Sequence, residues 1–107
     1  MELLTLREVC EMVGVSRRAV QGYESLEMVR PVGKNKYGYL LYDSAAVEKI
    51  QQIKQYRDMG FSVKETKELL IVADDVRKIR ILERIHEMQN EVIRLKTQIE
   101  IAEKMIQ

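Results

Sequence analysis

A heptad repeat in the last third of the chain is the feature that most constrains the fold. When Ile85 is counted as position a, every a and d position up to the C-terminal end is apolar. The a positions are Ile85, Val92, Ile99 and Ile106, and the d positions are Ile81, Met88, Leu95 and Ala102. A helix of about 30 residues is on the order of 45 Å long, and an amphipathic helix of that length needs a partner for its apolar stripe. We therefore expect residues 74–107 to form a dimerisation helix, with these eight positions in a homodimer seam.

The order of residue types in this seam favours two strands. β-branched residues at position a with Leu or Met at position d are typical of two-stranded coiled coils, in the parallel arrangement for which the rule is established. The charged residues beside the seam do not determine the direction: Glu91 and Lys96 would pair across a parallel dimer, and the other flanking positions are uninformative.

Composition narrows the class of protein. The chain has 107 residues, one cysteine and one histidine, with a net charge of +1. This length fits one domain with a helical extension, and neither a disulfide framework nor a Cys/His zinc cluster is available. No apolar stretch approaches the roughly 20 residues that span a bilayer, and the N-terminus does not resemble a signal peptide. We expect a cytoplasmic protein with no membrane partner.

Chemistry-bearing groups are sparse along the chain. No paired carboxylates, activated nucleophile or phosphate-binding glycine loop occurs at a workable spacing, which predicts that the protein is not an enzyme. We expect neither a metal nor a cofactor. Cys10 lies on an apolar helix face and is expected to be a buried packing residue, whereas His86 falls on an outward heptad position and is expected at the surface.

Residues 6–26 have the organisation of a helix-turn-helix. Thr5 and Glu8 form a capping box before a first amphipathic helix, Gly14 ends this helix, and Ser16 caps a second one. In DNA-binding proteins the second helix of this motif enters the major groove. Its residues expected to face inward are Val15, Ala19, Val20, Tyr23 and Leu26, and those expected to face outward include Arg17, Arg18 and Gln21.

The segment VGKNKYGYLLY predicts a β-hairpin, or wing, around a turn that contains Asn35 and Gly38. Residues 28–42 contain three basic residues and no acid, and the bases alternate with tyrosines. Cations and phenol hydroxyls together favour a phosphate backbone, although an ordinary solvated hairpin would have the same composition. After the wing, Asp43 caps a third helix that ends at Gly60. A capping box at residues 62–65 opens a fourth helix.

These segments together resemble the MerR family of bacterial transcription regulators over essentially the whole chain. The matching signals are the VS turn, the YE pair at Tyr23 and Glu24, the GYxLYD end of the wing and the GFSVKE start of the fourth helix. The resemblance implies a mostly α protein with a winged helix-turn-helix domain at residues 1–73, dimerised by an antiparallel coiled coil. We follow this implied direction because the heptad rule was calibrated on parallel zippers.

The resemblance also implies a function. Members of the family bind an inverted repeat in promoter DNA as dimers, and they commonly distort the promoter so that RNA polymerase engages both of its elements. For this chain we predict contacts with base edges by Arg17, Arg18 and Gln21, because Arg and Gln form bidentate bonds with purines. We predict contacts with the DNA backbone by Ser16, Tyr23, Lys34, Lys36, Tyr39 and Arg57.

The chain departs from the family pattern at two places. The family usually has an arginine where this chain has Gln21, and an arginine where its wing has Leu40. Two alternatives stay open for this reason: a protein-interaction module that modulates a chaperone cofactor, and an architectural, excisionase-like DNA binder. Larger members append an effector-binding domain after the dimerisation helix, and here the sequence ends in heptad register. We accordingly expect no small-molecule effector.

Overall fold

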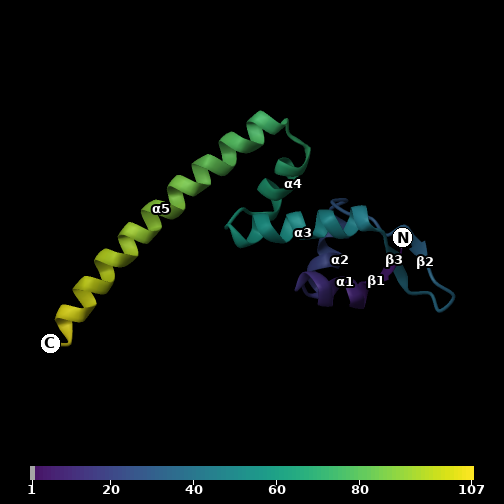
Figure 1. Ribbon diagram of the computed structural model, residues 1–107, viewed down its shortest axis with the longest axis horizontal. Coiled ribbons are helices and arrows are strands. Elements are labelled where there is room, and N and C mark those ends of the chain that lie inside the picture. The colour runs from purple at the N-terminus through teal and green to yellow at the C-terminus, as the bar shows by residue number, and fades with distance from the viewer. Residues whose placement is uncertain (1) are drawn as a thin grey trace. The chain divides into compact units, whose positions relative to one another are not determined.

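A computed structural model describes residues 2–107 and is mostly helical (Figure 1), which confirms the predicted fold class. Its elements in chain order are β1 (Leu4–Thr5), α1 (Leu6–Val13), α2 (Arg17–Ser25), β2 (Gly33–Lys34), β3 (Leu40–Tyr42), α3 (Ser44–Asp58), α4 (Val63–Ile71) and α5 (Asp74–Met105). The chain divides into two compact units, one up to Glu68 and the other Leu69–Gln107. The boundary predicted between residues 73 and 74 is the start of α5, whereas the compact units divide within α4.

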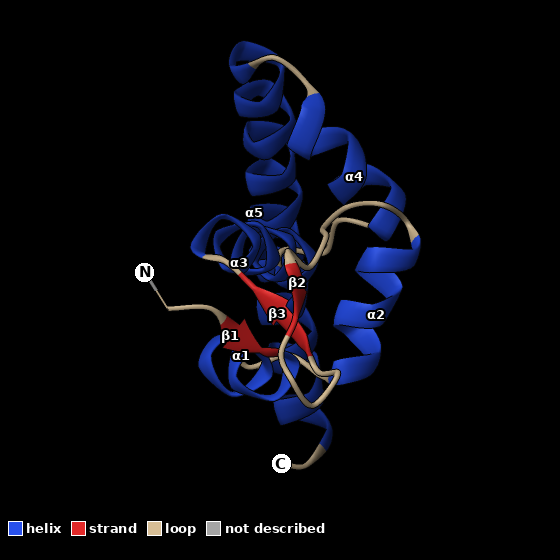
Figure 2. Ribbon diagram, turned by 90° about the vertical axis from the view of Figure 1, so that its right-hand side faces the viewer, coloured by secondary structure: helices blue, strands red, loops and turns tan. Residues whose placement is uncertain are grey.

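The first unit contains a small antiparallel sheet with the strand order β1-β3-β2 (Figure 2). β2 and β3 form the predicted wing, with Gly33 opposite Leu41 and Lys34 opposite Leu40. β1 was not predicted. It pairs Leu4 with Tyr42 and runs directly into α1, because Thr5 is both the end of the strand and the cap of the helix.

The predicted helix caps are present. At α1, the Glu8 amide donates to Thr5 Oγ1 over 3.3 Å and the Thr5 amide donates to Glu8 Oε1 over 3.0 Å. These hydrogen bonds from Thr5 lower the pKa of the Glu8 carboxyl. At α2, the Ala19 amide donates to the Ser16 hydroxyl over 3.0 Å, and Gly14 ends α1 in the left-handed region with φ 79°. Local sequence therefore fixes the turn between the two helices.

The later helices begin in the same way. The Ala46 amide donates to Asp43 Oδ1 over 2.9 Å at the start of α3. At α4, the Ser62 amide donates to Glu65 Oε1 over 2.8 Å and the Glu65 amide donates to Ser62 Oγ over 3.0 Å, which completes the second predicted capping box.

The core of the first unit lies between α1, α2, α3 and the sheet. Its buried apolar side chains are Val9, Val20, Tyr23, Met28, Val29, Tyr42, Ala46, Val47, Ile50, Ile53 and Phe61. Two expectations about burial were wrong. Leu26 is 43% exposed, because α2 ends at Ser25 and the chain turns away there. Cys10 is only half-buried, although partial burial raises the pKa of its thiol.

A buried hydrogen bond joins α2 to the wing. The Tyr42 hydroxyl donates to the Glu24 carboxylate, and the Tyr42 side chain is completely buried. Burial, followed by this hydrogen bond, raises the pKa of the Tyr42 phenol. The position of α2 relative to β3 is therefore fixed in part by a part-buried polar contact, at a place where an unpaired group is costly.

The second unit is dominated by α5, whose apolar side chains are largely exposed. Along the predicted seam, Ile81 and Met88 are half-buried and Ala102 is exposed. The larger exposed seam residues are Ile85 (37%), Val92 (50%), Leu95 (50%), Ile99 (55%) and Ile106 (86%). At the start of α5, Arg77 donates from Nε to the Leu69 carbonyl over 2.8 Å and from Nη2 to the Val72 carbonyl over 3.0 Å. These bonds satisfy carbonyls at the end of the preceding helix.

Candidate nucleic-acid interface

The outward face of α2 carries the residues predicted to contact base edges. Arg17, Arg18 and Gln21 are all exposed, whereas Val20 on the opposite face is completely buried. Tyr23, predicted to contact the DNA backbone, is 9% exposed and packs in the core. These positions follow from helical periodicity. The apolar face of an amphipathic helix packs on the core, and its charged side chains lie on the opposite, solvent-exposed face.

The turn of the wing is fixed by Asn35. Its Oδ1 accepts from the Tyr37 amide over 2.9 Å and from the Tyr39 amide over 3.0 Å. The Gly38 amide donates to the Asn35 carbonyl over 3.0 Å, and Gly38 has φ 83°, a conformation that favours glycine. One asparagine thus shapes the whole tip of the hairpin.

The tip of the wing presents cations and aromatic rings to solvent. Lys34 and Lys36 are exposed, and Tyr37 and Tyr39 are 72% and 63% exposed. Lys36 Nζ lies 5.1 Å from the centroid of the Tyr37 ring, and the Tyr37 and Tyr39 rings are 6.5 Å apart. These contacts order part of an exposed basic surface before any ligand binds.

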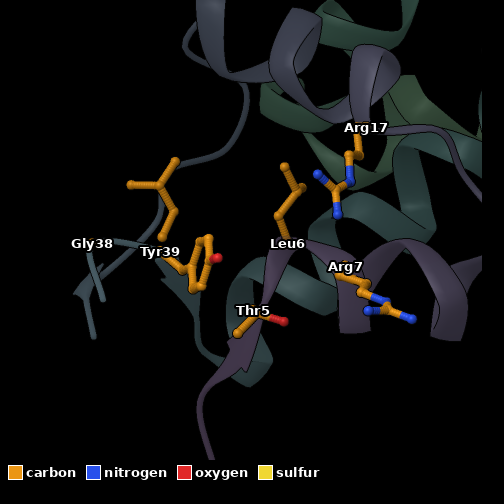
Figure 3. A pocket seen from close by; sticks show the side chains of 7 residues that line it. Thr5, Leu6, Arg7, Arg17, Gly38 and Tyr39 are labelled. Carbon is orange, nitrogen blue, oxygen red and sulfur yellow. The ribbon is translucent and has the colours of Figure 1, made fainter. Parts of the chain in front are cut away.

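A cleft of about 470 Å³ separates the wing from the start of α2. We call it the wing-helix cleft; it is lined by residues 5–7, Arg17 and residues 38–40. In Figure 3 the Tyr39 ring lies on one side, the Arg17 side chain on the other, and Leu6 between them. Sequence reasoning missed residues 5–7, because their spacing identifies only a helix start and not what lies opposite it.

Arg57, another predicted backbone contact, stabilises a joint between helices. Its Nη1 donates to the Phe61 carbonyl over 2.7 Å. The Phe61 ring packs edge to face on Tyr56, with centroids 6.1 Å apart. Arg57 as a whole residue is exposed, and this bond uses one of the five N–H donors of its guanidinium.

No group of three or more His, Cys, Asp or Glu side chains among residues 2–107 is arranged to hold a metal ion. Within the same residues, no helix has both the length and the apolar character needed to cross a membrane. What the described site offers is therefore a surface of guanidinium, ammonium, amide and phenol groups.

The architecture of this surface matches a known family. Residues 4–71 match the model of the MerR helix-turn-helix family of regulatory proteins. The chain belongs to the MerR family.

Individual MerR relatives differ in how much of their length this chain covers. The transcriptional activator mta of Bacillus subtilis is 37% identical over 65 residues, which are 61% of this chain and 25% of that protein. A probable heavy metal-dependent transcriptional regulator of Haemophilus influenzae is 27% identical over 97% of this chain and 80% of its own length. These relatives are transcription regulators, and the chain spans only a quarter of the first.

Solved MerR-family structures have the same fold. MtaN, the N-terminal part of the Bacillus subtilis multidrug transporter activator, superimposes with a TM-score of 0.75 at 27% identity, covering 96% of this chain and 97% of that one. HiNmlR, a MerR family regulator without the sensor domain, was solved bound to promoter DNA. It matches with a TM-score of 0.73 at 18% identity over 92% of this chain and 80% of that one, which shows the shared fold.

Most of the MerR motif residues in this chain make hydrogen bonds that hold the fold. Glu24 of the YE pair and Tyr42 of the GYxLYD motif form the buried hydrogen bond between α2 and β3. Asp43 of the same motif caps α3, and residues 62–65 of the GFSVKE motif form the capping box of α4. These motif residues therefore set α2 against β3 and define the starts of α3 and α4.

Proposed function

We propose that this MerR-family protein is a dimeric, sequence-specific regulator of transcription that binds and distorts promoter DNA. The observation that carries the proposal is the pairing of two surfaces on one domain. The outward face of α2, with Arg17, Arg18 and Gln21, lies across the wing-helix cleft from the basic wing. A helix with bidentate donors next to a cationic hairpin suits simultaneous reading of a groove and holding of the adjacent backbone.

The proposed contacts divide by chemistry. Arg17, Arg18 and Gln21 contact base edges in the major groove, where guanidinium groups select guanine and an amide selects adenine. The backbone is held by groups that read no sequence: Ser16, Tyr23, Lys34, Lys36, Tyr39 and Arg57. Within that set, Lys34, Lys36 and Tyr39 carry most of the binding because they lie together on the exposed wing, whereas the buried Tyr23 contributes mainly through the position of α2.

The proposed dimer forms through α5. Seam residues such as Leu95 and Ile99 are about half exposed in the single chain, and burial of apolar surface on this scale is a strong driving force for association. The antiparallel direction is supported by the family resemblance. Two α2 helices related by a twofold axis then read the two halves of an inverted repeat, and half-site spacing follows from the length of the coiled coil.

The remaining parts of the proposal follow from this dimer. Distortion of the promoter lets RNA polymerase, the second proposed partner, engage both promoter elements, and such a regulator works in the cytoplasm. The relative HiNmlR was solved with promoter DNA, which supports DNA as the ligand here. We propose that the protein is not an enzyme and that its ligand is double-stranded DNA.

A selection experiment tests the proposal. Purified protein selects from a random duplex library at about 0.15 M salt, and the enriched sequence is then placed at different positions in a fragment to measure bending by gel mobility. We expect an inverted repeat and position-dependent mobility. The control is a variant with Arg17, Arg18 and Gln21 changed to Ala, which should enrich no sequence. Binding to all duplexes alike by the unaltered protein would contradict sequence-specific regulation, and capture of a chaperone cofactor without duplex binding would favour the interaction module.

A further inference from the structure

We propose that the wing-helix cleft binds one phosphodiester of the DNA backbone and that Arg7 of α1 supplies a cation to it. This inference rests on the proposed DNA-binding function and adds a residue and a position to it. If α2 lies in the major groove and the wing lies on the neighbouring backbone, one sugar-phosphate strand has to run between them. The cleft of about 470 Å³ is the space between those two elements.

The charge of the cleft comes entirely from its helix side. Among its lining residues, Arg7 and Arg17 are cationic, none is acidic, and the wing contributes the neutral residues 38–40. Glu8, the acid next to Arg7 in sequence, is held by hydrogen bonds from the Thr5 amide and hydroxyl, both over 3.0 Å. An anion in the cleft therefore meets positive charge on one wall and no competing carboxylate in the lining.

Arg7 is available to such an anion. In the free protein its Nε lies 3.3 Å from Glu11 Oε1, and the two side chains are 76% and 69% exposed. An exposed ion pair of this kind is weak, whereas a guanidinium forms short, bidentate, charge-assisted bonds with phosphate. The Arg7 guanidinium points away from Tyr39 in the free protein (Figure 3), so it turns from Glu11 to the phosphate when DNA enters the cleft, and the Tyr39 hydroxyl donates to the same backbone.

Arg17 has a related position with a different role. It lies at the first turn of α2 and lines the cleft, so it borders both the outward face of the helix and the proposed phosphate (Figure 3). Arg7 is on α1 and has no access to base edges through that face. The prediction for Arg7 is consequently a contact that strengthens binding to every duplex without changing which sequence is preferred.

The test is a salt titration of DNA binding by fluorescence anisotropy, with the selected site and a random duplex. Arg7→Ala should weaken binding to both duplexes by the same factor, about 3 to 10-fold, and should reduce the slope of log K against log salt by about 2, because each copy in the proposed dimer loses one phosphate contact. Arg7→Lys should retain the slope. Arg94→Ala, which removes an exposed arginine from α5, is the control and should leave the slope unchanged.

A second substitution makes the location of the phosphate testable. Leu40→Arg places a cation on the wing wall of the same cleft, so in the Arg7→Ala background it should restore the slope and most of the affinity. Arg7→Gln replaces Arg7→Ala if the alanine variant has altered circular dichroism. Unchanged affinity and slope in the Arg7 variants of a protein that binds DNA would overturn this inference and leave the proposed function intact. An unaltered protein that binds no duplex would instead remove the proposed function.

The same chemistry would also suit a free phosphate. Inorganic phosphate is added at constant ionic strength without DNA, and the amide signals of residues 38–40 are followed by NMR. A backbone site should give no saturable shift below about 10 mM, because an isolated anion lacks the positioning contacts of the duplex. Saturation in the low millimolar range that is lost in Arg7→Ala would assign the cleft to a free anion and overturn the inference.

Discussion

The two compact units of this chain differ in how far their apolar side chains are buried. In the first unit, Val9, Val20, Ile50 and Ile53 are completely buried, and each helix start has its own cap. In the second unit, the larger seam residues of α5 beyond Met88 are at least half exposed. The first unit buries its apolar residues within its own core, whereas the apolar face of α5 is exposed in the single chain and is the surface of the proposed dimer. Apolar periodicity therefore forms a core in the first unit, and in α5 it supplies the surface for the proposed assembly.

The largest effect is expected from a charge in the α5 seam. Leu95→Asp places a carboxylate at position d in both copies of the proposed dimer, and an unpaired buried charge costs roughly 3 to 5 kcal/mol. Light scattering should show a monomer, and affinity for an inverted repeat should fall with it. The tertiary packing of the first unit, followed by the amide NMR signals of its core residues, should be retained, because these residues pack on one another within that unit.

His86→Asp provides the matched control. It introduces the same charge on the same helix at an exposed position outside the seam, so the dimer should persist. A Leu95→Asp protein that is still dimeric would show that the apolar stripe of α5 is not the interface. The proposed explanation for the exposed apolar residues of the second unit would then be wrong.

The next effect concerns α2 and the wing, the two halves of the proposed interface. Arg17→Ala with Arg18→Ala should weaken binding to the selected site by about 100-fold, since each bidentate base contact contributes about 1 to 3 kcal/mol, and should leave random duplex binding much less affected. Lys34→Ala with Lys36→Ala should weaken both duplexes alike and reduce the salt slope by about 4, because each copy in the proposed dimer loses two phosphate contacts. Equal loss of specificity in the two double variants would contradict the division into base and backbone contacts.

Much of the fold could be predicted from local signals. The helix caps join residues three positions apart, so donor and acceptor lie in the same short stretch of sequence. These caps are Thr5 with Glu8, Ser16, Asp43, and Ser62 with Glu65. The wing was predictable in the same way from the asparagine and glycine of its turn. The long helix was predictable because its heptads repeat without interruption.

The remaining features depend on groups that are distant in sequence. β1 has two residues, too few to show a strand pattern, and it forms because Leu4 meets Tyr42. The bond between Glu24 and Tyr42 spans 18 positions. Arg7 was identified as a candidate site residue only from the fold, in which α1 lies beside the wing. The sequence periodicity does not predict which elements lie side by side.

The next prediction concerns the hydrogen bond between Tyr42 and Glu24 in the first unit. Tyr42→Phe removes the donor to the half-buried Glu24 carboxylate and should lower the free energy of unfolding by about 1 to 3 kcal/mol in urea titrations. Tyr37→Phe is the control, because Tyr37 is 72% exposed and most such surface changes stay within about 0.5 kcal/mol. An unaffected midpoint in Tyr42→Phe would mean that α2 is held by apolar contacts alone.

The same bond gives a pH dependence with a definite sign. The pKa of the Tyr42 phenol is raised in the folded protein by burial and by the Glu24 carboxylate. A raised pKa means that the stabilisation is fully present below the unfolded value of about 10 and is lost as the pH rises toward the folded value. The stability advantage of the unaltered protein over Tyr42→Phe should therefore shrink above about pH 10. A constant difference from pH 8 to 11 would contradict it.

The smallest effect is expected at Glu27, where α2 ends. Glu27 has φ 59°, and among residues 2–107 it is the one residue other than glycine with positive φ. The Met28 amide donates to the Tyr23 carbonyl and the Glu27 amide to the Glu24 carbonyl, both over 2.9 Å. This is the Schellman arrangement, which favours glycine at the left-handed position. The first unit therefore holds local backbone strain at the corner between α2 and the wing.

Glu27→Gly should relieve that strain and stabilise the protein by about 1 kcal/mol, partly offset by the greater freedom of glycine in the unfolded chain. Glu27→Ala keeps the Cβ atom and should give no gain, which separates backbone strain from the loss of the carboxylate. Urea titration of the three proteins measures the order. If alanine stabilises as much as glycine, the carboxylate rather than the backbone is unfavourable at this corner, and Glu27 holds no backbone strain.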